Sequence, residues 1–129
     1  MIKYRKGYDI DYIRLIELLN EAGSDVDTDN FKDLVQMVEN SALVLTAWDF
    51  DYMVGFVRVD LTGENAIISD LVVDNEYRDM DICKNMIGNV LSCYPGSKFT
   101  LKADKKDGLI CESLGFRPVE DGSGLYCRY

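Results

Sequence analysis

The chain has 129 residues, of which 47% are hydrophobic, and it carries a formal net charge of −9 at pH 7. This length suits one domain that buries roughly two-thirds of its unfolded surface, so we expect a single domain over residues 1–129. The negative charge opposes binding to nucleic-acid phosphates, and no basic stripe with interleaved aromatic residues offsets it. We therefore expect no nucleic-acid partner.

The sequence also lacks the usual signals of export, membrane insertion and metal binding. No apolar run approaches the ~18 to 20 residues of a membrane span, and the charged start MIKYRKGYD lacks the apolar centre of a signal peptide. The four cysteines are widely spaced, form no CxxC pair and have no histidine to complete a zinc site. We expect a soluble, cytoplasmic protein with reduced thiols and no membrane contact, in which proton transfer uses groups other than histidine.

Hydrophobic periodicity predicts one strand and two helices in the first third of the chain. A strand is expected at residues 2–5, and apolar residues continue with helical spacing from residue 8 to residue 22. A second helix is indicated by apolar residues at i, i+3, i+4 and i+7, which are Phe31, Leu34, Val35 and Val38. Thr28 or Asp29 is placed to cap this helix.

The remainder of the chain mixes strands and helices. Three β-rich runs, over residues 42–48, 52–60 and 66–73, are separated by the short turns DFD and TGEN and predict an antiparallel meander. The further predicted elements are a helix over 78–94, a strand over 98–102, a helix over 107–114 and a hairpin of 116–119 with 125–128.

Two motifs in this framework resemble those of a known family. DLVVDNEYR is similar to the family signature of leucine-x-valine, two or three residues, glutamate, x and arginine, and CESLGF is similar to its tyrosine-glutamate-lysine-leucine-glycine-phenylalanine. With this element order, almost the whole chain resembles the GNAT superfamily of acetyl-CoA-dependent N-acetyltransferases. The resemblance implies an α/β (α+β) fold with a mixed, mostly antiparallel central sheet flanked by helices, in the order β-α-α-β-β-β-α-β-α-β-β.

The resemblance implies that acetyl-CoA binds where the third strand of the meander leads into the next helix. The pantetheine arm would pair with backbone groups of Leu71, Val72 and Val73. The pyrophosphate would lie against unpaired N–H groups at the helix start, where an arginine adds positive charge. The residues expected at this turn are Arg78, Asp79, Met80, Asp81, Ile82, Cys83 and Lys84.

This turn is a degenerate version of the family pattern. Family members usually have glycine, or glycine then alanine, where this chain has Asp81 and Cys83. Side chains at these positions occupy space that a phosphate needs, and Asp81 adds like-charge repulsion. Asp79 and Asp81 can instead accept hydrogen bonds from the helix N–H groups and act as an internal phosphate mimic. Binding of acetyl-CoA is therefore either weakened or lost.

The expected proton donor is also unusual. The family tyrosine that protonates the CoA thiolate is replaced by Cys111, which is either an acid catalyst or an apolar packing residue. Tyr126 is a substitute donor or a structural residue.

Asp70 is the first choice for the base that takes a proton from the attacking amine. A carboxylate within an otherwise apolar strand is costly to bury, so its presence there indicates a functional or structural role. The residues predicted on its strand face are Ala66, Ile68 and Val72. Glu64 or Asn65 at the start of the strand, or a water relay, are the alternatives.

Asp25, Asp27 and Asp29 have the carboxylate spacing of a calcium loop. However, Asn30 stands where such a loop needs glycine and Gln36 where it needs a bidentate glutamate, so we expect no metal. The resemblance implies that this segment borders the acceptor site, where three carboxylates suit a cationic amine or a basic peptide. The alternative is a solvated acidic loop that caps the second helix.

Two functions remain open at this point. One is an active N-acetyltransferase that transfers acetyl from acetyl-CoA to an amine of a small molecule or protein by direct attack. The other is a catalytically inactive binding or regulatory module that has kept the fold and lost acetyl-CoA. The sequence leaves open the acceptor, the length of the acyl group, and whether the protein is a monomer or a homodimer.

Overall fold

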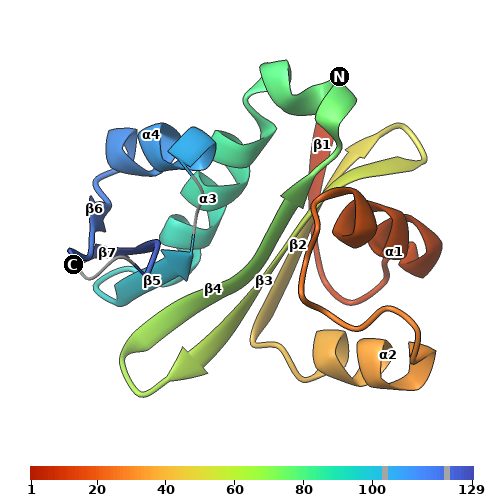
Figure 1. Cartoon of the computed structure of the whole chain (residues 1–129), viewed down its shortest axis with the longest axis horizontal. Coiled ribbons are helices and arrows are strands. Elements are labelled where there is room, and N and C mark those ends of the chain that lie inside the picture. The colour runs from red at the N-terminus through yellow and green to blue at the C-terminus, as the bar shows by residue number, and fades with distance from the viewer. Residues whose placement is uncertain (103–104, 121–122) are drawn as a thin grey trace.

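The chain forms a seven-stranded sheet with helices on both faces (Figure 1). The computed structural model describes residues 1–102, 105–120 and 123–129, without the side chains of residue 79 and residues 105–107. Its elements in chain order are β1 (Ile2–Lys6), α1 (Tyr12–Glu21), α2 (Phe31–Glu39), β2 (Leu43–Asp49), β3 (Tyr52–Thr62), β4 (Asn65–Val73), the 3-10 helix η1 (Asn75–Met80), α3 (Ile82–Cys93), β5 (Lys98–Lys102), α4 (Lys105–Ser113), β6 (Arg117–Pro118) and β7 (Leu125–Arg128).

The strand order is β1-β2-β3-β4-β5-β7-β6, and every pairing is antiparallel except that of β4 with β5. The predicted mixed sheet, the antiparallel meander of β2 to β4 and the order of the elements are therefore confirmed. No helix among the described residues is long and apolar enough to cross a lipid bilayer.

Helix starts differ from the sequence predictions. The first helix begins at Tyr12 because Asp11 is its N-cap and accepts a hydrogen bond from the backbone N–H of Arg14. The second helix is capped by Asn30, which accepts from the N–H of Asp33, so the prediction of Thr28 or Asp29 as cap is wrong. In both cases the residue closest to the helix supplies the acceptor.

A separate apolar core lies on each face of the sheet. Helices α3 and α4 cover one face, where Met86, Phe99 and Phe116 are fully buried together. Helices α1 and α2 cover the other face, where Leu15 and Phe56 are buried. Each such side chain contributes about 1.5–3 kcal/mol relative to an exposed position, so both faces hold the sheet in place.

A β-bulge interrupts the pairing of β3 with β4. Arg58 pairs with Asp70, but its neighbour Val59 pairs with Ile68, so Ser69 is an extra residue in β4. A bulge of this kind re-aims the side chains that follow it. The register of β4 therefore changes at Ser69.

The bulge reverses the alternation of side chains along β4. Ala66 and Ile68 belong to the core under α3, whereas Val72 belongs to the core under α1. Asp70 lies two residues before Val72 and shares its face. The prediction that Asp70 shares a face with Ala66 and Ile68 is wrong, because simple alternation does not allow for the extra residue.

The two parallel strands part after a short paired segment. Residues 65–68 of β4 pair with residues 98–101 of β5. Residues 69–73 of β4 continue beyond this ladder with no described partner strand on that side. The result is an open fork at the carboxyl end of β4, with unpaired backbone groups along one edge.

Candidate functional site

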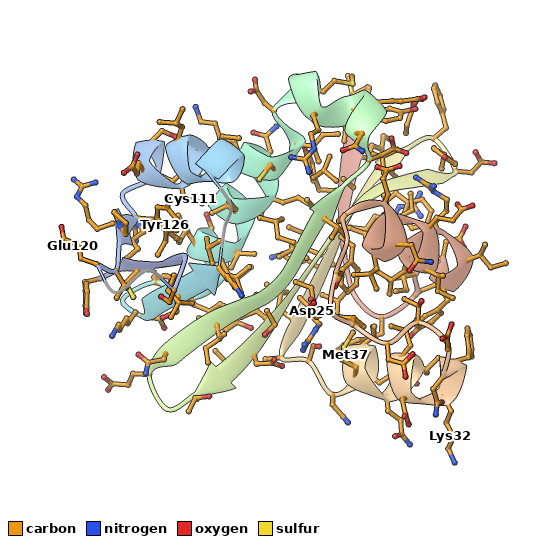
Figure 2. The ribbon with its side chains drawn as sticks, viewed as in Figure 1. Asp25, Lys32, Met37, Cys111, Glu120 and Tyr126 are labelled. Carbon is orange, nitrogen blue, oxygen red and sulfur yellow. The ribbon has the colours of Figure 1, made fainter. Side chains whose placement is uncertain are left out.

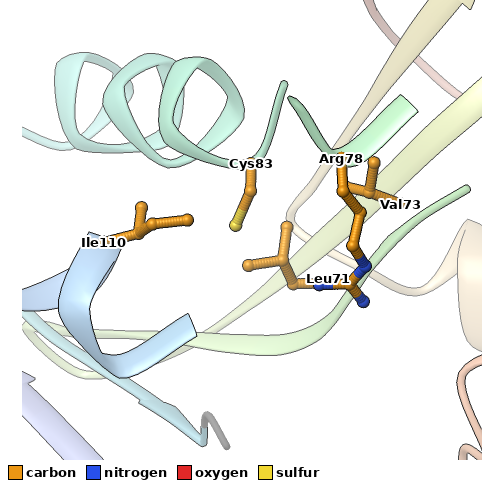
Figure 3. A pocket seen from close by; sticks show the side chains of 5 residues that line it. All are labelled: Leu71, Val73, Arg78, Cys83 and Ile110. Atoms are coloured by element: carbon orange, nitrogen blue, oxygen red, sulfur yellow. The ribbon is translucent and has the colours of Figure 1, made fainter. Parts of the chain in front are cut away.

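Two hollows meet at the fork. The first, which we name the turn cavity, has a volume of about 30 Å³ and is lined by Leu71, Val73, Arg78, Cys83 and Ile110 (Figure 3). The second, which we name the loop groove, has a volume of about 280 Å³ and is lined by Ala22, Gly23, Ser24, Asp25, Ser69, Asp70, Leu71, Val72 and Lys102. Leu71 lines both hollows, so they lie side by side at the open edge of β4.

The turn before α3 keeps a backbone conformation that favours glycine. Asp81 has φ 56° and ψ 22°, which is the left-handed region. Aspartate is one of the few other residues that enter this region with modest strain. The sequence lacks the glycine that the resemblance implies at this position, yet the backbone has the shape for which glycine is usually needed.

Asp81 does not act as an internal phosphate mimic. Its side chain is exposed and makes no cap hydrogen bond to α3, so this part of the prediction is wrong. The side chain of Asp79 lies outside the described residues. In the first turn of α3, Ile82 is buried in the core, Cys83 lines the turn cavity and Lys84 is exposed. First-turn N–H groups lack intrahelical acceptors, and the helix start favours anions.

The helix predicted over residues 78–94 begins four residues later than expected. Arg78 and Met80 belong to η1, and α3 starts at Ile82. Arg78 donates a hydrogen bond from Nε to Asn75 Oδ1 at 3.1 Å. Figure 3 shows its guanidinium beside Leu71 and the sulfur of Cys83 directed toward Leu71 and Ile110.

A buried ion pair fixes the start of this turn to α1. Arg14 Nη2 lies 2.8 Å from Asp74 Oδ2, and the two residues are only 8% and 6% exposed. Arg14 also donates from Nε to the carbonyl of Met53 and stacks its guanidinium 4.0 Å from the centre of the Tyr52 ring. Burial lowers the pKa of Arg14, but hydrogen bonds to Glu17 and Asp74 outweigh it and raise the pKa above its ordinary value.

Two further hydrogen bonds hold η1. Tyr77 donates its hydroxyl to Asp49 Oδ2 at 2.7 Å, which ties the turn to the end of β2. This hydrogen bond is the main reason why the pKa of Tyr77 is raised to about 12. The backbone N–H of Asn75 donates to Glu21 Oε1 at 2.8 Å, which ties the turn to the last residue of α1.

Asp70 is part of a charged network beside the loop groove. Arg58 donates from Nε to Asp70 at 2.5 Å and from Nη1 to Asp60 at 2.8 Å. Ser69, the extra residue of the bulge, donates its hydroxyl to Asp60 at 2.7 Å. The side chains of Arg58 and Asp70 are 15% and 12% exposed, so the network fixes the Asp70 carboxylate at the edge of the groove.

The alternative bases lie elsewhere. Glu64 and Asn65 are exposed at the β3–β4 turn, where Asn65 pairs with Lys98. This is the paired end of β4, opposite the end that lines the two hollows.

The three aspartates of the loop between α1 and α2 are not equivalent. Asp25 lines the loop groove. Asp27 accepts a hydrogen bond from the N–H of Asp29 at 2.9 Å, and both residues are exposed outside the groove lining. Figure 2 shows Asp25 on the side of α1 and α2, away from Cys111 and Tyr126. Among the described residues no cluster able to hold a metal ion is found.

The two candidate proton donors lie on the opposite side of β4 (Figure 2). Cys111 is fully buried in the core under α3 and α4, which fits the packing alternative. Tyr126 is half-buried on β7, pairs with Leu101 of β5, and presses its hydroxyl against Gly108 of α4 so closely that a Cβ there would overlap it.

The polar site residues Arg58, Asp60, Ser69 and Lys102 are among those that the sequence analysis missed. For two of them, the sequence does contain a pattern that could have indicated the site. Arg58 and Asp60 are charged residues two positions apart in an otherwise apolar strand, which places them on one face. Ser69 gave no signal, because a bulge leaves no clear pattern in a single sequence.

Comparison with known proteins supports the fold. No protein-family model and no curated protein matches the sequence. The PaiA N-acetyltransferase of Thermoplasma acidophilum, solved with coenzyme A, matches with a TM-score of 0.80 and 19% identity over 100% of this chain and 99% of its own.

Two further solved structures are similar. The GNAT-family N-acetyltransferase YhbS of Escherichia coli, solved with CoA, matches with a TM-score of 0.74 and 19% identity over 98% of this chain and 80% of its own. An aminoglycoside acetyltransferase from an uncultured soil metagenomic sample, solved with sisomicin, has a TM-score of 0.66 and 22% identity over 88% of this chain and 84% of its own. The chain thus has the GNAT fold.

Proposed function

We propose that this protein is an N-acetyltransferase that transfers an acetyl group from acetyl-CoA to a primary amine by direct attack. The observation that carries the proposal is the meeting of the turn cavity and the loop groove at Leu71, where the fork opens. A donor in the fork and an acceptor in the groove would lie on the two sides of one residue. Such proximity favours direct transfer.

The edge of β4 fits the pantetheine arm. Residues 71–73 lie beyond the paired segment and carry backbone groups available for an extended, amide-containing ligand. When bound, acetyl-CoA supplies the thioester carbonyl that the amine attacks. In this proposal the chain orients that carbonyl toward the loop groove.

The turn fits a pyrophosphate through its backbone and its cations. The left-handed conformation of Asp81 is the shape that brings main-chain N–H groups close to a phosphate. Arg78 and Lys84 supply positive charge next to Asp81. The turn cavity is about 30 Å³, and in this proposal the exposed Arg78 side chain moves aside as the phosphates bind.

The loop groove fits a cationic amine. Asp25 from the loop after α1 and Asp70 from β4 both line the groove, and Asp70 is the proposed proton acceptor. Lys102 is the cation in the groove lining. The similarity to an aminoglycoside acetyltransferase solved with sisomicin supports an amine-rich acceptor class.

The proton needed by the departing CoA thiolate is assigned to Tyr126. Its hydroxyl lies against Gly108 of α4, the helix whose Ile110 lines the turn cavity. Full burial makes Cys111 a poor candidate for contact with a thiolate. The proposal therefore keeps Cys111 as a packing residue.

Calorimetric titration with acetyl-CoA tests this proposal. We expect saturable micromolar binding by the natural chain and tighter binding by the Asp81→Gly, Cys83→Gly double variant. A panel of amines followed by mass spectrometry then identifies acetylated acceptors. No binding until the glycines are introduced would overturn the proposal and favour the inactive module.

A further inference from the structure

Helix α1 reaches both hollows at its C-terminal end. It ends at Glu21, and the next four residues, 22–25, line the loop groove. This segment is held to the helix by backbone hydrogen bonds, from Ala22 to Leu18 at 3.0 Å and from Ser24 to Leu19 at 3.0 Å. A displacement of the end of α1 therefore displaces the groove wall.

The same helix end contacts the turn beside the other hollow. Glu21 Oε1 accepts the backbone N–H of Asn75 at 2.8 Å. Asn75 Oδ1 in turn accepts Arg78 Nε at 3.1 Å, and Arg78 lines the turn cavity. Two hydrogen bonds thus connect the cavity wall to the last residue before the groove wall.

A second contact between α1 and the turn lies deeper in the protein. Arg14, two turns earlier in α1, holds Asp74 in a buried ion pair next to Asn75. This pair fixes the distance between helix and turn, whereas Glu21 is exposed at the surface. Loss of Glu21 therefore leaves the anchor in place and removes only the link between the two hollows.

We propose that Glu21 is a positioning residue that couples the loop groove to the cofactor turn, so that acetyl-CoA at the turn orders residues 22–25. The inference rests on the proposed function, because it names acetyl-CoA as the ligand of the turn. In the proposed function Arg78 moves as the phosphates bind, which changes its hydrogen bond to Asn75, and Asn75 is in turn held by Glu21 beside the groove wall. Coupling of this kind is reciprocal, so an acceptor in the groove raises the affinity for acetyl-CoA by the same factor.

Amide hydrogen exchange with acetyl-CoA as the probe tests this inference without a known acceptor. In the natural protein we expect saturating acetyl-CoA to slow exchange at residues 22–25 as well as at residues 75–78. Glu21→Ala should abolish the response at 22–25 and weaken acetyl-CoA binding by about threefold to tenfold, as loss of one ordinary, solvent-exposed hydrogen bond predicts. Glu21→Gln keeps a carbonyl acceptor and should restore most of the response.

Glu39→Ala is the matched control. Glu39 is also an exposed glutamate at the last position of its helix, α2, and the described residues place no hydrogen bond between it and the turn. Its substitution changes the charge equally and should leave both responses intact. Equal effects of Glu21→Ala and Glu39→Ala would show that the loss of one negative charge is enough to cause the change, and this result would overturn the inference.

The outcomes separate this inference from the proposed function. Binding of acetyl-CoA without any response at residues 22–25 overturns the inference and leaves the proposed function standing. Absence of binding overturns both. An unchanged response in Glu21→Ala likewise overturns the role of Glu21, whatever the affinity.

Discussion

The turn cavity and the loop groove lie on the two sides of Leu71 and are built in different ways. The cavity side depends on the main chain, through the open edge of β4, the left-handed Asp81 and the start of α3. The groove side depends on side chains, which belong to a network of two carboxylates, an arginine and a serine. A site built from the main chain keeps its geometry after most side-chain substitutions, whereas a site built from polar side chains is lost when one of them is replaced.

This difference explains how a chain without the expected glycines retains the backbone of the turn. Asp81 enters the left-handed region at a modest cost, and the anchors on Asp74, Asn75 and Tyr77 hold the turn in place. The groove tolerates substitution less well than the turn, because the position of the Asp70 carboxylate depends on its ion pair with Arg58. Four variants and one titration test the contrast, in order of decreasing effect.

The largest effect is expected from loss of the buried anchor. Asp74→Ala removes the buried partner of Arg14 and leaves the buried guanidinium paired only with the exposed Glu17, so the free energy of unfolding should fall by about 3–5 kcal/mol in urea denaturation. The control is Glu17→Ala, which removes an ion pair whose glutamate side chain is 57% exposed and should cost at most about 1 kcal/mol. Equal losses in the two variants would show that the turn needs no buried anchor.

Substitution at the proposed base should act on catalysis more than on the fold, because asparagine keeps an oxygen acceptor for Arg58 and Asp60 still pairs with that arginine. Asp70→Asn keeps the shape of the side chain but removes the proton acceptor, so kcat for an amine acceptor should fall by about 100-fold or more. Binding of acetyl-CoA should be unchanged, because Asp70 lies on the groove side. A change in acetyl-CoA affinity with full turnover would contradict the separation of the two hollows.

Substitution of Asp81 should have an intermediate effect on stability, because its backbone is in the left-handed region. Asp81→Val forces a β-branched residue into the left-handed region and should lower the free energy of unfolding by about 1–2 kcal/mol. Asp81→Gly should show no such loss. If valine and glycine gave equal stability, the turn would not be held in the left-handed conformation in solution.

A smaller effect is expected at the rim of the groove. Asp25→Asn should raise KM for a cationic acceptor by about twofold to fivefold, since exposed charge pairs contribute about 0.2–1 kcal/mol. Asp27→Asn is the control, because Asp27 is exposed outside the groove lining. Identical KM values in the two variants would remove Asp25 from the acceptor site.

Tyrosine titration gives the smallest signal. The pKa of Tyr77 is raised to about 12 by its hydrogen bond to Asp49, so folding favours the neutral phenol. Its stabilising contribution is present below pH 10, the ordinary pKa, and is lost as the pH rises from 10 through 12. Tyr77→Phe should remove one late tyrosinate from the ultraviolet absorbance titration. An unchanged titration curve would show that this hydrogen bond does not form.

The fold was largely predictable from the sequence, because hydrophobic periodicity marks strands and helices directly. Strand β5 was predicted with its observed bounds, residues 98–102. The start of α3 was not, since Arg78 to Met80 continue the helical pattern while the backbone forms η1. Single-sequence periodicity does not distinguish a 3-10 turn from the first turn of an α-helix.

The site was less predictable than the fold, because it depends on register and on contacts between distant residues. The motif located Leu71, Val73, Arg78 and Cys83, which the structure brings around one cavity. The bulge at Ser69 shifted the face of Asp70, and pairing with Arg58 across β3 is a tertiary contact. Neither follows from spacing within one strand.

The short ladder between β4 and β5 also determines how the protein responds to force. Four residues on each strand join the four N-terminal strands of the sheet to the three C-terminal ones. Under tension applied between these two halves, we expect the sheet to separate along this seam of four residue pairs, because few hydrogen bonds share the load there. A ligand paired along the open edge of β4 would lengthen the seam, so the occupied protein would rupture at a higher force than the empty one.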